Sequence, residues 1–333
     1  MRTLAAVFLF SLTALAIDGT VVNRTTGKPQ PGATVTLYQL GQAGMDSIES
    51  VKSDAQGKFE ISRNVSGPRL IQAAYDGVTY NHMLPPGAPT TGLTVDVYNS
   101  LPQPGAAAVA QHMVLLEPSG ERLTVSESYI FQNDGTTTYN DPDRGTLSFY
   151  LPPEAKGLVQ VRATAPKGMP IQRAAEKTER ADIYKLDFPI KPGETRIDLT
   201  YFVPFKDKGV FEGKLLHKGG ATRLVTPAGV TLKGEAVRAL GAEPRTQANI
   251  YDVQGSAFRV TVEGTGSLRQ PETEAQDGGP SIQQIMPRIY KNLAWILTLG
   301  LGILALGFLL LYRAQPVVAN SGDAREAHGG TRR

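Results

Sequence analysis

The sequence predicts an all-β fold: tandem antiparallel β-sandwiches followed by one C-terminal transmembrane helix. Glycine and proline are abundant, with 35 and 23 among 333 residues, which is typical of many tight turns. Short runs of alternating apolar and polar residues recur between these turn signals, as expected of half-buried strands. Residues 293–312 carry no charge, and at about 1.5 Å per residue they span a hydrocarbon layer of roughly 30 Å.

The N-terminal residues 1–16 predict a cleaved secretory signal peptide. Arg2 supplies a basic start, residues 4–12 are apolar, and Ala14-Leu15-Ala16 has the small-x-small form of a cleavage site. An uncleaved N-terminal anchor is the alternative. A signal followed by a membrane helix places the residues between them outside the cytoplasm and leaves 313–333 as a short cytoplasmic tail. We therefore expect a single-pass protein of the bacterial inner membrane.

Composition excludes several classes of function. The chain has no cysteine, so disulfides, thiolate metal sites and cysteine nucleophiles are all excluded. An exported protein without cysteine fits a bacterial cell envelope and must rely on apolar cores for stability. The net charge is only +3, and no dense basic block with interleaved aromatics is present. Nucleic acid is therefore not an expected partner.

Residues 17–99 predict the first sandwich. Val35 and Leu37 alternate with polar residues, and Phe59 and Ile61 share a face in the same way. Turn signals separate these runs, as in Asp54-Ala55-Gln56-Gly57. Alternation between closely spaced turns indicates an antiparallel sandwich.

Four short motifs in this region carry a family resemblance. They are Gly19-Thr20-Val21-Val22, Thr26-Gly27-Lys28-Pro29, Pro31-Gly32-Ala33-Thr34-Val35 and Ser53-Asp54-Ala55-Gln56-Gly57-Lys58-Phe59. In order and spacing they resemble the carboxypeptidase regulatory-like domain. The resemblance implies a transthyretin-like β-sandwich that is an accessory module without catalytic residues. It further implies a role in binding, folding support or spacing.

The remaining exported residues predict more β structure. Strand-like runs over 100–206 indicate an Ig-like sandwich, and Asn133-Asp134-Gly135 is a strong turn signal within it. Residues 207–267 form either a smaller β unit or a continuation of the preceding sandwich. Residues 268–292 are a polar linker. The pattern leaves open whether 100–267 is one domain or two.

No catalytic, cofactor-binding or metal-ligating residues are predicted, and the chain is not expected to be an enzyme. The four histidines, none of which pairs with another at metal-ligand spacing, are His82, His112, His217 and His328. No nucleophile elbow and no phosphate-binding glycine loop is present.

Two carboxylate groupings remain as alternatives. Asp134, Asn140, Asp141 and Asp143 could supply oxygen ligands to calcium, although Asp and Asn are also the commonest turn formers. Glu121, Glu127 and Glu154 could supply a carboxylate pair for glycoside cleavage, but sequence does not define their separation.

These observations favour a non-catalytic, membrane-anchored protein that binds an envelope component, either protein or glycan, or serves as a subunit of a membrane complex. Tyr75, Tyr80 and His82 are candidate contacts, with core packing as the competing interpretation. Small residues at Ala294, Thr298 and Gly302 could pair two membrane helices into a homodimer. The alternatives are an envelope hydrolase with an unrecognised site and an assembly factor for exported proteins.

Overall fold

The computed structural model describes residues 16–41, 44–63 and 65–268. In these residues the chain is built from strands, with one short 3-10 turn, η1 (Pro153–Ala155), so the all-β prediction is confirmed. The described residues contain no helix with the length and apolarity that a membrane crossing requires. The predicted signal peptide, except for Ala16, and the predicted membrane helix and tail lie outside the described residues, as does the linker beyond Leu268.

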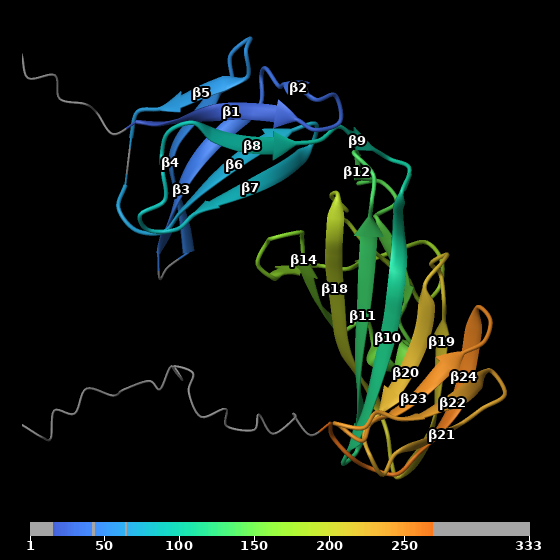
Figure 1. The fold of residues 1–333 in the computed structure, drawn as a ribbon. Coiled ribbons are helices and arrows are strands. Elements are labelled where there is room, and N and C mark those ends of the chain that lie inside the picture. Colours follow the sequence, from blue (N-terminus) through green and yellow to red (C-terminus); the bar gives the residue numbers. More distant parts are fainter. Residues whose placement is uncertain (1–15, 42–43, 64, 269–333) are drawn as a thin grey trace, which may run out of the picture. The chain divides into compact units, whose positions relative to one another are not determined.

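The N-terminal region forms two facing sheets with their own core (Figure 1). Its strands are β1 (Ile17–Asn23), β2 (Lys28–Pro29), β3 (Thr34–Gly41), β4 (Gly44–Lys52), β5 (Lys58–Ile61), β6 (Arg69–Tyr75), β7 (Val78–Leu84) and β8 (Leu93–Val97). One sheet has the order β4-β3-β6-β7. In the other, β1 pairs antiparallel with β5 and β2 and in parallel with β8.

The alternation in the sequence explains why these strands face each other. In β1 every second residue is buried, beginning with Ile17, while the residues between are only partly covered. Val35 and Leu37 of β3 and Phe59 and Ile61 of β5 are buried in the same cluster. Because side chains alternate across a strand, each sheet presents one apolar face, and the two faces meet in the core.

The second region begins after a short parallel pair, β9 (Ser100–Leu101) with β12 (Thr138–Tyr139). Its further strands are β10 (Ala107–Ser119), β11 (Arg122–Asn133), β13 (Leu147–Tyr150), β14 (Val159–Thr164), β15 (Ile171–Arg173), β16 (Glu176–Lys177), β17 (Ile183–Leu186), β18 (Gly193–Pro204), β19 (Lys208–Lys214), β20 (Ala221–Thr226), β21 (Thr231–Lys233), β22 (Val237–Ala242), β23 (Asn249–Val253) and β24 (Ala257–Glu263).

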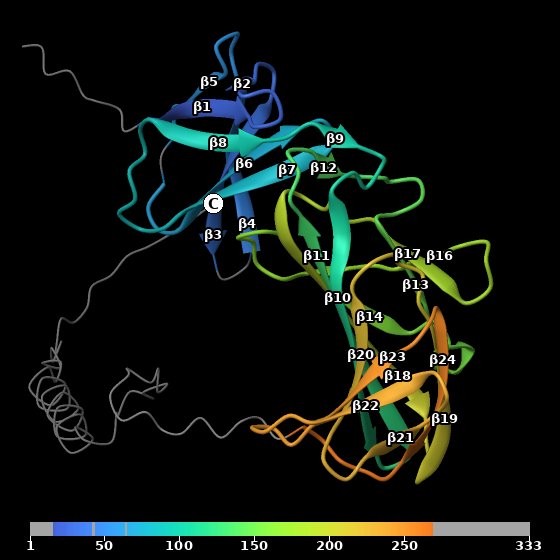
Figure 2. The ribbon, with the colours of Figure 1, turned by 45° about the vertical axis from the view of Figure 1, so that its right-hand side comes forward.

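One long sheet organises this region, in the order β15-β14-β18-β11-β10-β20-β23-β22. Two small sheets, β13-β17-β16 and β19-β24-β21, lie beside it (Figure 2). Val125 of the long sheet, Phe149 of the first small sheet and Phe211 of the second belong to one buried apolar cluster. The small sheets therefore cover one face of the long sheet and enclose a single core with it.

This core contains residues from both sides of position 206. The connection is made by β20, which pairs with β10 in parallel, from Gln111 opposite Ala221 to Leu115 opposite Val225. The long sheet thus joins strands of the 100–206 and 207–267 segments. Two other pairs of the named strands are also parallel, β1 with β8 and β9 with β12. The remaining pairings between the named strands are antiparallel.

Candidate functional site

The most concentrated group of ionisable side chains lies inside the second core, around Glu127. In β11 the apolar residues Leu123, Val125, Tyr129 and Phe131 face the core, and Glu127 stands in the same alternation. Its side chain is therefore directed inward and is only 7% exposed. A buried carboxylate is costly unless it is paired and hydrogen-bonded, so its partners determine whether the fold tolerates it.

Three side chains contact the Glu127 carboxylate. The Tyr201 hydroxyl on β18 donates to Oε1 at 2.6 Å, and the Tyr129 hydroxyl donates to Oε2 at 2.8 Å. The His112 ring on β10 places Nε2 at 3.1 Å from Oε2. Burial alone would raise the pKa of Glu127, but the hydrogen bonds of these groups and the charge of His112 outweigh it and hold that pKa below its usual value.

The two tyrosines remain neutral donors in this setting. Burial, and then the charge of Glu127, raise the pKa of both Tyr129 and Tyr201 well above the usual value. The ring of Tyr129 also stacks on His112, with ring centroids 3.9 Å apart. The carboxylate is thus fixed by donors from both neighbouring strands.

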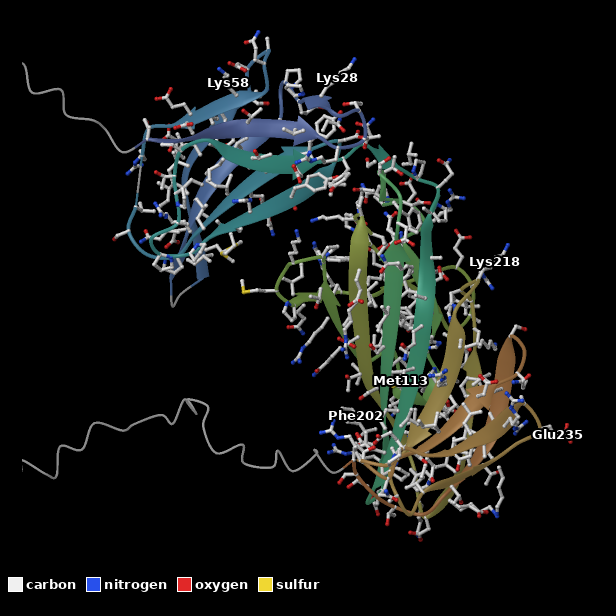
Figure 3. The ribbon with its side chains drawn as sticks, viewed as in Figure 1. Lys28, Lys58, Met113, Phe202, Lys218 and Glu235 are labelled. Carbon is white, nitrogen blue, oxygen red and sulfur yellow. The ribbon has the colours of Figure 1, made fainter. Side chains whose placement is uncertain are left out.

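His217 extends the cluster towards the surface. It lies on the loop before β20, next to Lys218, which Figure 3 labels. Its Nε2 is 3.2 Å from Nδ1 of His112, and its own Nδ1 is 3.0 Å from the carbonyl oxygen of Gly219. A carbonyl oxygen only accepts, so Nδ1 of His217 carries a hydrogen.

Counting hydrogens then assigns the charge. A neutral His217 with its hydrogen on Nδ1 has a lone pair on Nε2. We therefore assign to Nδ1 of His112 a hydrogen that faces this lone pair and the Thr222 hydroxyl oxygen, which is 3.3 Å from the same Nδ1. His112 also donates from Nε2 to Glu127 and is therefore the imidazolium, which forms a buried ion pair. Burial, and then the charge of His112, lower the pKa of His217, in agreement with a neutral ring.

The space beside Glu127 is too small for a substrate. The cavity is about 10 Å³ and is lined by His112, Glu127, Tyr150, Tyr201 and Lys214, among others. A volume of this size holds about one water molecule. The cluster therefore supports a structural role, in which a buried ion pair connects β10, β11, β18 and the loop before β20.

The neutral state of His217 predicts acid sensitivity. Its folded pKa lies below its unfolded value of about 6.5, so the unfolded chain binds more protons as the pH falls through that value. We expect the urea midpoint of the second region to be lower at pH 5.5 than at pH 7. The His217→Gln variant should lose part of this difference, and His82→Gln, outside the cluster, should keep it. An identical pH difference in His217→Gln would contradict the assignment.

A second candidate site is an open cleft of about 210 Å³ along β7 and β8. The residues that line it are Tyr80, Asn81, His82, Thr94, Val95, Asp96, Tyr98, Ala165, Pro166, Lys167, Gly168, Lys191 and Pro192. Tyr80 and Tyr98 form a ring pair with centroids 5.8 Å apart. Burial raises the pKa of Tyr80 to about 12, and its hydroxyl donates to the Tyr98 carbonyl oxygen at 2.9 Å.

Lys191 is the unusual charge in this cleft. Its Nζ donates to the Thr79 carbonyl oxygen at 2.5 Å and lies 5.2 Å from the centroid of the Tyr80 ring. Within the described part of the chain, no carboxylate forms a salt bridge with it. Burial, and then the nearby charge of Arg173, lower the pKa of Lys191 to about 8. A lysine held in this way is a common feature of ligand sites.

The candidate residues named from the sequence lie in different parts of the structure, and only some of them belong to the two sites. Tyr80 and His82 line the cleft, whereas the hydroxyl of Tyr75 lies 3.2 Å from Oδ1 of Asn99. Glu127 is in the buried cluster, without Glu121, which lies in the β10–β11 turn, or Glu154, which lies in η1. His328 lies outside the described residues.

The Asp134–Asp143 loop makes turn contacts. The Asp141 carboxylate accepts hydrogen bonds from the backbone N–H and the side chain of Arg144, and Asp134 accepts one from Gln132. Among residues 16–41, 44–63 and 65–268, no group of three or more His, Asp or Glu side chains is placed to hold a metal ion.

Sequence reasoning did not find the His112–Glu127 pair, although the signal is present. Glu127 stands at a core position of an alternating strand, and the β10–β11 hairpin register places its neighbour Tyr129 opposite His112. His217 and Lys191 have no comparable local signal, because their neighbours in the two sites lie about a hundred residues earlier in the chain.

No family model and no curated protein matches this chain. Among solved structures, a similarity is found to an M1 zinc metallopeptidase from Deinococcus radiodurans, with 13% sequence identity and a TM-score of 0.24. The match covers 47% of this chain and 42% of the peptidase chain, so less than half of that protein is represented.

Proposed function

We propose that this chain is a non-catalytic, membrane-anchored envelope protein that binds another envelope component through the β7–β8 cleft. In this proposal residues 17–99 are a transthyretin-like module of the carboxypeptidase regulatory-like type, and the second region begins with an Ig-like sandwich. A signal peptide exports the chain, and the helix at 293–312 anchors it in the inner membrane. The cleft carries the proposal, because it combines an open concave surface with convergent polar groups.

The character of the cleft favours binding over catalysis. It presents the half-buried ring of Tyr98 and the cation of Lys191, and tyrosine is one of the residues enriched at binding hot spots. The clustered acid–base residues, Glu127 and the two histidines, lie instead beside a cavity of about 10 Å³ in the core. The cluster of Glu127, His112 and His217 is therefore separate from the surface that could hold a partner.

Site-specific photo-crosslinking in intact cells tests this function. A photoreactive residue at Lys167, which is exposed beside the cleft, should capture a defined neighbour. The matched control is Lys58 of β5, which is also exposed and does not line the cleft (Figure 3). We expect at least tenfold more adduct from position 167. Equal capture from both positions, or none from 167, would remove the cleft as the binding surface.

A further inference from the structure

The β7 strand has a free edge beside the cleft. Asp76 and Gly77 both have positive φ, 50° and 74°, and connect β6 to β7 as a two-residue hairpin turn. Tyr75 and Val78 close this turn as a hydrogen-bonded pair, so in β7 the backbone groups of every second residue face β6. Those of Thr79, Asn81 and Met83 face away from it, and no strand in the described ranges pairs with that edge.

The contact of Lys191 agrees with this geometry. Its Nζ donates to the carbonyl oxygen of Thr79, which is the first outward-facing carbonyl of the edge. The next outward-facing residues, Asn81 and Met83, are exposed. An unpaired edge of this kind is a template for an added strand, in which main-chain hydrogen bonds supply affinity.

The charge of the cleft favours an acidic occupant. Lys167 and Lys191 line it, and Arg173 is close enough to lower the pKa of Lys191. The acidic lining residue, Asp96, is already engaged by Nε of Arg24 at 2.7 Å. Lys191 has a backbone carbonyl and an aromatic ring as neighbours, so a carboxylate would provide the charge partner that its surroundings lack.

The size of the cleft limits what enters it. Sites for drug-sized ligands usually measure about 300–1,000 Å³, whereas this cleft is about 210 Å³. It therefore suits one side chain with its adjoining backbone better than an extended glycan.

We propose that the cleft binds an extended polypeptide segment of a partner protein, which adds to the β7 edge at Asn81 and Met83 and places an Asp or Glu carboxylate at Lys191. This inference rests on the proposed binding function and specifies its partner. Side chains on one face of the added strand enter the cleft, and the acidic one supplies specificity.

A peptide-display selection tests the partner class. The full-length protein in detergent is presented with a library of random ten-residue peptides, in parallel with Lys191→Met and the control Lys58→Met. We expect the wild type and Lys58→Met to enrich peptides with an acidic residue at one fixed position. A selected peptide should bind Lys191→Met at least tenfold more weakly, and its binding to the wild type should weaken as the pH rises through about 8.

Hydrogen exchange gives a readout that does not depend on a variant. The bound peptide should slow amide exchange in the segment 78–84 and leave 58–61 of the same sandwich unchanged. Failure to enrich any peptide, enrichment without acidic preference, or equal binding to Lys191→Met would overturn the inference. Lysine-dependent binding to arrayed glycans would also overturn it. In each of these cases a specific crosslink from Lys167 leaves the binding function standing, so the two proposals fail separately.

Discussion

Glu127→Gln should lower the free energy of unfolding of the second region by about 3–5 kcal/mol, the cost of breaking a buried ion pair from one side. The glutamine removes the charge that balances the His112 imidazolium. Its N–H₂ accepts no hydrogen bond, so either Tyr201 or the pair of His112 and Tyr129 loses its acceptor. The measurement is a urea titration of the full-length chain followed by circular dichroism. We expect the midpoint to fall with an unchanged slope.

Two further variants separate this effect from a general loss of charge. Glu121→Gln, in the exposed β10–β11 turn, should change stability by no more than about 0.5 kcal/mol. The double variant Glu127→Gln/His112→Gln removes both charges and should be more stable than the sum of the two single effects predicts. A Glu127→Gln protein within about 1 kcal/mol of wild type would show that the pair is not charged in the fold.

Gly264→Ala should be the second most damaging substitution, with an expected loss of about 3 kcal/mol or more. Gly264 has a φ of 100°, and a Cβ built on it would overlap the carbonyl oxygen of Gly229. The obstacle is backbone, so no side chain can rotate away from it. The end of β24 would have to separate from the turn before β21. This separation would expose the core side chains at that end of β24, such as Val262.

Gly241→Ala is the matched control for this prediction. Gly241 has a similar φ of 109°, but a Cβ there would meet no heavy atom within 4 Å. It should therefore show only the conformational cost of a non-glycine residue at positive φ, about 1–3 kcal/mol. Thermal unfolding of both variants isolates the steric contribution of Gly264. Equal losses would mean that the overlap is relieved at little cost.

The strands were the most predictable part of this molecule. Val35 and Leu37 share one face of a strand, as do Phe59 and Ile61. This requires only that neighbouring side chains point to opposite faces, which is a local property. Pairing partners were less predictable. The parallel pairs of β1 with β8 and β10 with β20 join strands far apart in the chain, and nothing in either strand specifies its distant neighbour.

In the two sites, too, residues close together in the sequence could be predicted and distant partners could not. Tyr80 and His82 could be named from the sequence because they are ring-bearing residues just before the loop at 83–87, and both line the cleft. Lys191, which supplies the charge, lies in the loop before β18, 111 positions after Tyr80, and only the fold brings it to the β7 edge. The sequence does not show whether a carboxylate or a lysine is buried or which groups surround it. Its pKa depends on both, so the pKa could not be predicted from the sequence.

The amino-acid sequence by itself determined the all-β class and the inward face of each well-alternating strand, because both depend on residues two positions apart. The tertiary structure decided that one core joins the strands on both sides of residue 206 and that His217 meets the ion pair of His112 and Glu127. Each of these depends on contacts across about a hundred residues. Such contacts form when separate apolar faces are buried together, and that burial is a property of the assembled sheets.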